Sequence, residues 1–126
     1  MKSNDKKLSA LPRENEIIIY QASDGTTKID VRMQGETLWL SKNQMAELFG
    51  RERSVIGKHI RNIFAEGELE EKSNGQKMPV PNSDKPADFY SLDVTLAVGY
   101  RVKSPLATQF RQWATAVLHE YYKKAS

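Results

Sequence analysis

The sequence contains no cysteine, only two histidines and no long apolar run, and each shortage excludes a class of function. Without cysteine there can be no thiol catalysis, disulfide framework or cysteine-based zinc site. His59 and His119 fall on separate predicted helices and no carboxylates cluster at ligand spacing, so we expect no metal site and no cofactor. A chain without cysteine also suits a reducing cytoplasm, where we expect it to act.

Membrane and secretion signals are scarce as well. The longest uncharged apolar stretch, residues 94–100, is far shorter than the roughly 20 residues that span a bilayer. The N-terminal lysines are not followed by an apolar segment, as they would be in a signal peptide. No glycine-rich phosphate loop or other catalytic motif is present. We therefore expect no membrane association and no enzymatic activity.

The net charge of +3 is unevenly distributed. Residues 1–13 hold four basic side chains against Asp5, which accounts for the whole excess and leaves the rest of the chain neutral. We expect this segment to be a disordered basic arm and residues 14–126 to form one domain of ordinary globular composition. The overall charge therefore says little about DNA binding, and any such case depends on local clusters.

Alternating apolar residues and turn signals predict a β-hairpin or small antiparallel sheet over residues 16–40. A loop or wing is expected over residues 68–90, with two weaker strands that prolines interrupt. The expected strands are 16–20, 28–33, 37–40, 76–80 and 87–90, with turns at 23–26, 34–35 and 82–85.

Capping residues and apolar periodicity predict four helices. The first two form a pair over residues 41–65, and the other two follow the loop, so the predicted fold class is α+β. The expected starts are Ser41 for the first helix, Ser54 for the second, Ser91 or Asp93 for a third over 92–100, and Ser104-Pro105 for a fourth over 105–123.

The helix pair over residues 41–65 has the features of a helix-turn-helix. Ala46 is small enough for two helices to approach closely, Gly50 accepts a positive φ at the turn, and Ile60 fills the contact. His59 stands where many such motifs have an apolar residue, so its register decides which side of the second helix faces outward. The loop that follows is either a wing that contacts DNA or an ordinary loop.

The second helix of this pair presents side chains suited to a DNA groove. Arginine and asparagine recognise guanine and adenine edges, valine can contact a thymine methyl group, and a helix N-terminus attracts phosphate. The other explanation is a solvated helix face with no ligand. Residues 51–63 carry four basic side chains against Glu52. The predicted contacts to double-stranded DNA are Arg51, Arg53, Ser54, Val55, Lys58, His59, Arg61 and Asn62.

An apolar stripe along the last predicted helix leaves a second class of function open, a protein-interaction or regulatory module. Core packing is the other explanation for the stripe. A dimer through this helix would suit a helix-turn-helix, because paired units read two half-sites about one helical turn apart. The residues considered for such a homodimer are Phe110, Trp113, Val117 and Tyr121.

Two groups of segments form a recognisable set: 36–40, 44–50 and 59–69, then 90–93, 98–104 and 108–115. Together they resemble the RhuM family of bacterial virulence-associated proteins. The resemblance implies a DNA-binding protein found near restriction-modification or pathogenicity loci. Residues 73–85 are richer in proline than the family pattern, and longer relatives continue past the last helix. We therefore expect a truncated chain or a short family member.

Overall fold

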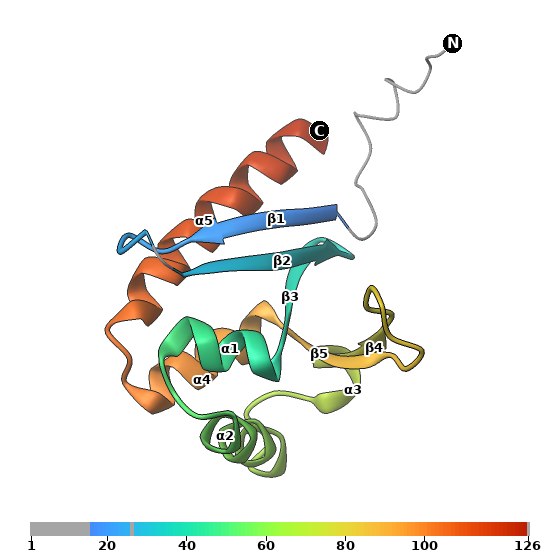
Figure 1. Ribbon diagram of the computed structural model, residues 1–126, viewed down its shortest axis with the longest axis vertical. Helices are drawn as coiled ribbons and strands as arrows, with labels where there is room; N and C mark the ends of the chain where they lie inside the picture. Colours follow the sequence, from blue (N-terminus) through green and yellow to red (C-terminus); the bar gives the residue numbers. More distant parts are fainter. Residues whose placement is uncertain (1–15, 26, 126) are drawn as a thin grey trace.

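The computed structural model describes residues 16–25 and 27–125, so the predicted basic arm lies outside the described residues. The α+β class predicted from the sequence is confirmed (Figure 1). In chain order the elements are β1 (Glu16–Gln21), β2 (Lys28–Gln34), β3 (Thr37–Ser41), α1 (Lys42–Phe49), α2 (Arg53–Ala65), α3 (Glu71–Asn74), β4 (Gly75–Met78), β5 (Ala87–Ser91), α4 (Leu92–Val102) and α5 (Leu106–Ala125).

The strands form one antiparallel sheet in the order β1-β2-β3-β5-β4. A two-residue turn joins β2 to β3, and its residues Gly35 and Glu36 have φ of 61° and 70°, as a type I′ hairpin requires. The chain then leaves through three helices and returns, so that β5 pairs with β3, with Leu40 opposite Tyr90. The expected loop or wing is therefore partly built into the main sheet, and the short helix α3 within it was not predicted.

One face of the sheet packs against the helices. Alternation along β2 places Ile29, Val31 and Met33 on this face, where they are buried. Figure 1 shows α5 running behind β1 and β2, with α1 and α4 below them. Phe49 of α1 and Phe110 of α5 are buried in the same core. Strands and helices from both halves of the sequence thus share one hydrophobic core.

Polar contacts fix α5 along the sheet. Near its start, the Ser23 hydroxyl donates to Gln109 Oε1 at 3.0 Å. Near its end, the Tyr122 hydroxyl donates to the Glu36 carbonyl at 2.8 Å. Tyr20 of β1 packs edge-on against the Phe110 and Trp113 rings between these two bonds.

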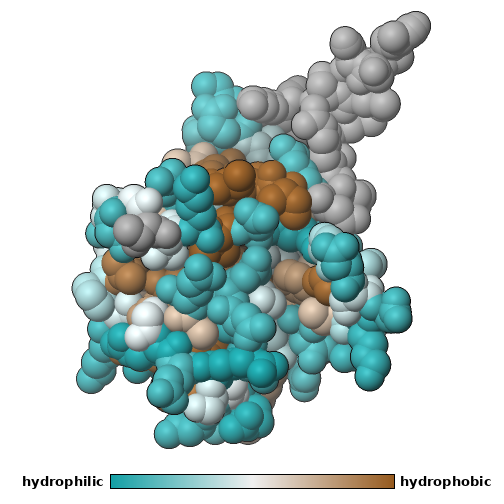
Figure 2. Space-filling model, viewed as in Figure 1, coloured by the Kyte–Doolittle hydropathy of each residue, from teal (hydrophilic) through white to brown (hydrophobic). Residues whose placement is uncertain are grey.

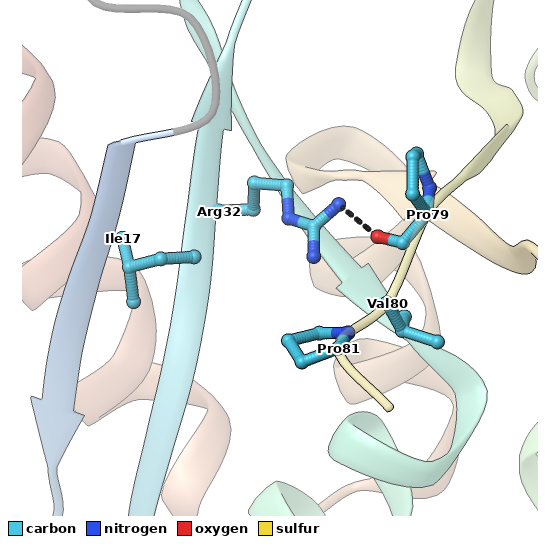
Figure 3. A pocket seen from close by; sticks show the side chains of 5 residues that line it. All are labelled: Ile17, Arg32, Pro79, Val80 and Pro81. Carbon is cyan, nitrogen blue, oxygen red and sulfur yellow. Dashed lines mark hydrogen bonds between the residues drawn. The ribbon is translucent and has the colours of Figure 1, made fainter. Parts of the chain in front are cut away.

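The opposite face of the sheet carries a second, smaller core of Trp39, Met78 and Phe89. The Arg32 guanidinium lies 4.7 Å from the centroid of the Phe89 ring, a cation–π distance. The same guanidinium donates to the Pro79 carbonyl at 2.9 Å (Figure 3). Through these contacts Arg32 holds the proline-containing loop that follows β4 against the sheet.

Beside this loop, Ile17 and Ile19 of the edge strand β1 remain 47% and 60% exposed. Figure 2 shows a hydrophobic patch in the upper part of this face. A hollow of about 440 Å³ separates β1 from the loop, lined by Ile17, Arg32, Pro79, Val80 and Pro81 (Figure 3). The lining contains no carboxylate, imidazole or hydroxyl group.

Most predicted helix caps are confirmed. The Ser41 side chain accepts from the Gln44 N–H, and the Gln44 side chain accepts from the Ser41 N–H, which completes a capping box. Gly50 ends α1 in the left-handed conformation and Ser91 caps α4. The prediction for Ser54 is wrong, because α2 begins at Arg53 and the extended residue before it is Glu52, which makes no side-chain cap bond. Helix α4 also runs to Val102, beyond the predicted end at residue 100.

Candidate nucleic-acid interface

Helices α1 and α2 are joined by the three residues Gly50, Arg51 and Glu52. Gly50 has φ 66° and ψ 39°, and its N–H donates to the Ala46 carbonyl. The Arg51 N–H donates to the same carbonyl at 3.1 Å. In Figure 1 α1 lies across the view while α2 is seen nearly end-on below it, so their axes are steeply inclined. The predicted pair of consecutive helices with a tight glycine turn is therefore present.

The Arg51 side chain holds this turn in place. Its Nη1 donates to the carbonyls of Phe49 at 3.2 Å and Gly50 at 3.3 Å, and its Nη2 donates to the Val102 carbonyl at 2.9 Å. Phe49 and Val102 end α1 and α4, where carbonyls have no partner inside their own helix. One guanidinium thus joins two helix ends. Arg51 was predicted to contact DNA, but the structure engages it in these internal bonds.

Helix α2 buries one side and exposes the other. Ile56, Gly57, Ile60 and Ile63 are buried against the body of the protein. Because an α-helix turns once in about 3.6 residues, the opposite side is centred on Lys58. We call this the outer side of α2. The predicted contact residues Ser54, Val55, Lys58 and Arg61 are exposed on this side, and Asn62 is half-buried there. Arg53 is exposed in the first turn of α2, on the side of the helix that carries Ile56 and Ile60.

His59 lies on the flank of α2, half-buried beside the buried Ile60. Burial lowers its pKa below the ordinary value, and the positive charges of Lys58 and Arg101 lower the pKa further. The folded protein therefore favours the neutral imidazole. This register makes Lys58, rather than His59, the centre of the outward side.

Arg101 of α4 ties down the segment that follows α2. Its Nη2 donates to Glu66 Oε1 at 2.7 Å and to Glu68 Oε1 at 2.8 Å. The bond to Arg101 lowers the pKa of the Glu66 carboxyl. Two of the acidic side chains at this end of the helix are thus paired with a cation, which reduces their repulsion toward an anionic ligand.

The outer side of α2 carries uncompensated positive charge. The helix contains Arg53, Lys58 and Arg61 and no aspartate or glutamate. None of these three forms an ion pair or hydrogen bond with another residue in the described part of the chain. The helix lies at the lower edge of the molecule in Figure 1, and most of the corresponding surface in Figure 2 is hydrophilic. The geometry therefore offers an accessible cationic helix.

The apolar stripe of α5 serves the core. Phe110 is fully buried, and Trp113, Val117 and Tyr121 are half-buried and pack against the same core. A homodimer through this stripe stays a prediction, and Phe110 has no exposed surface to contribute to it.

Within residues 16–25 and 27–125, no three histidine, aspartate or glutamate side chains gather where they could hold a metal ion. None of the helices in that part of the chain combines the length and apolar character needed to cross a bilayer.

These features define a small α+β protein with a basic helix pair mounted on an antiparallel sheet. Residues 69–126 match the model of the Virulence protein RhuM family, in agreement with the resemblance seen in the sequence. The match begins after α2, so the basic helix itself lies outside the matched residues. No curated protein and no solved structure matches the chain.

Proposed function

We propose that this chain is a non-catalytic DNA-binding protein of the RhuM type, in which α1 and α2 act as a helix-turn-helix. The observation that carries the proposal is the exposed positive charge of α2, where Lys58 and Arg61 on the outer side and Arg53 in the first turn have no acidic partner among the described residues. Cations that replace the counterions of backbone phosphates supply most of the affinity of proteins for DNA. A single α-helix also fits the major groove of B-form DNA.

Each contact residue has a role that its chemistry suggests. Arg53 and Arg61 can bind backbone phosphates, and Asn62 can pair with adenine. Lys58, at the centre of the outer side, suits a backbone phosphate. Val55 is 37% exposed and can meet a thymine methyl group. His59 lies on the flank of α2 and its pKa is lowered, so we expect it to contribute shape rather than charge.

In the cell, this function implies a cytoplasmic bacterial protein that regulates transcription at specific sites. The match of residues 69–126 to the RhuM family model supports a bacterial, virulence-associated setting.

The test is a titration of labelled mixed-sequence duplex DNA at several salt concentrations. For the wild type we expect log affinity to fall steeply with log salt. Changing Arg53, Lys58 and Arg61 together to Gln should reduce that slope by about 2–3, since each lost phosphate contact removes about 0.9. A wild type that binds no duplex at low salt would contradict the proposal.

A matched control removes the same charge elsewhere. Lys28, Lys85 and Arg111 are exposed and lie outside α1 and α2. Their combined change to Gln should leave most of the affinity and slope intact. An equal loss in both triple variants would show that total charge, and not α2, governs the binding.

A further inference from the structure

We infer that Lys42 and Arg61 hold one backbone phosphate of duplex DNA between them, at the junction of α1 and α2. We call this pair the phosphate clamp. The inference rests on the proposed DNA-binding function and deepens it, because Lys42 lies outside the set of contact residues that the sequence predicted. It also extends the interface from one helix to two.

The two charged groups converge on Gly57. A Cβ atom placed on Gly57 would lie 3.5 Å from Lys42 Nζ, 3.5 Å from Lys42 Cδ and 3.5 Å from Arg61 Nη1. Lys42 crosses from the first turn of α1, while Arg61 reaches back from one turn later in α2, the direction that helical side chains favour. An ammonium and a guanidinium therefore approach the same point above the backbone of α2.

This convergence lacks a compensating anion. Neither Lys42 nor Arg61 forms an ion pair or hydrogen bond with another of the described residues. Lys42 is half-buried, so solvent screens it less than a fully exposed lysine. Two like charges held close together repel each other, and an anion between them removes that repulsion. A phosphate oxygen is a strong acceptor for both ammonium and guanidinium donors.

The position of the pair fits a phosphate at the edge of a groove. Gly57 lies between the buried side of α2 and its outer side, on the flank that meets α1. If the outer side of α2 enters the major groove, this flank faces the sugar-phosphate backbone that borders the groove. Backbone contacts of this kind fix the register of a recognition helix without reading sequence. Because Gly57 has no side chain, Lys42 can lie directly across α2.

The test compares Lys42→Gln with Lys28→Gln, a control that removes one charge from an exposed lysine of β2. For Lys42→Gln we expect the slope of log affinity against log salt to fall by about 0.9, the value for one phosphate contact. The loss should be the same on every duplex sequence. Lys28→Gln should leave the slope unchanged. The double change of Lys42 and Arg61 should weaken binding less than the product of the single effects, because both groups hold the same phosphate.

A second variant does not depend on deleting a cation. Gly57→Glu places a carboxylate beside both charged groups, where it should occupy the position of the phosphate. We expect DNA binding to fall at least as far as in the double variant while the circular dichroism spectrum stays that of the folded protein.

The possible failures are distinguishable. If the wild type binds no duplex DNA at low salt, the proposed function and the phosphate clamp fall together. If the wild type binds and the triple variant of Arg53, Lys58 and Arg61 does not, while Lys42→Gln retains the wild-type slope, only the clamp is overturned.

Discussion

The Nη2 atom of Arg51 lies 2.9 Å from the carbonyl oxygen of Val102, so the turn that precedes α2 is bonded to the last residue of α4. The same guanidinium also caps the C-terminal end of α1, because it donates hydrogen bonds to the carbonyls of Phe49 and Gly50. Since α2 begins two residues later, the direction in which it leaves the body depends on this side chain.

Arg51 and Arg53 should therefore behave differently when each is changed to Gln. Arg51→Gln leaves helix-end carbonyls without their donor, and we expect the free energy of unfolding to fall by about 1–3 kcal/mol. The salt dependence of DNA affinity should keep its wild-type slope. Arg53→Gln, at an exposed site, should leave stability unchanged and reduce the slope by about 0.9. Urea unfolding and salt titrations measure both effects. A reduced slope for Arg51→Gln would return that residue to the DNA interface.

Alanine should have opposite effects at two buried helical glycines. At Gly57 the nearest atoms would be 3.5 Å from a new Cβ, an ordinary contact, so Gly57→Ala should stabilise the protein by up to about 1 kcal/mol through helix propensity. At Gly99 the new Cβ would lie 2.9 Å from both Ala107 Cβ and Phe49 Cζ. Gly99→Ala should destabilise by about 1–3 kcal/mol through overpacking. Urea denaturation of the two variants checks this, and equal effects would contradict it.

The lowered pKa of His59 predicts a pH dependence of stability. Since the folded protein disfavours the charged imidazole, the contribution of His59 is complete above its ordinary pKa of 6.5. It declines as the pH falls from that value to the lower pKa of the folded state. Unfolding measured at pH 7.5 and pH 5 should lose less stability in His59→Gln than in the wild type. A titration of His59 by NMR with a midpoint at or above 6.5 would refute the prediction.

Arg101 links this titration to the acidic end of α2. Its charge is one of the causes that lower the pKa of His59. Arg101→Gln should consequently raise the NMR midpoint of His59 and return the pKa of Glu66 toward its ordinary value. Because Glu66 is exposed, we expect the change to be visible in these titrations more clearly than in the unfolding free energy. Lys103→Gln, at an exposed residue just beyond α4, serves as the control and should leave both values in place.

Local signals predicted much of this fold. Ser41, Gly50 and Ser91 act on backbone groups within four residues of themselves, so their roles could be inferred from the neighbouring sequence. Ser54 failed because a cap residue needs extended backbone, and Glu52 supplies that conformation at φ −70° and ψ 150°. Serine is the better capping side chain, but the position of the turn after Gly50 decides where α2 begins.

The parts that sequence could not predict depend on distant residues. The pairing of β5 with β3 and the bond from Arg51 to Val102 join segments that are far apart in the sequence. Apolar periodicity describes only one segment at a time, so it cannot predict such contacts. The exposed character of Lys58 and Arg61 was predictable from the apolar spacing of α2. The approach of Lys42 to Gly57 was not, since it requires the path of one helix across another.

The placement of β5 between β3 and β4 also makes the two halves of the chain depend on each other for folding. The segment that matches the RhuM model begins at residue 69, yet its strand β5 pairs with β3, which precedes that segment. Its Gly99 also leaves the space that the ring of Phe49 occupies. A fragment that began at residue 69 would keep the pairing of β5 with β4, but it would lose the pairing of β5 with β3 and leave an apolar surface uncovered. A bulkier residue at position 99 therefore fits only if both of its neighbours, Phe49 and Ala107, give way.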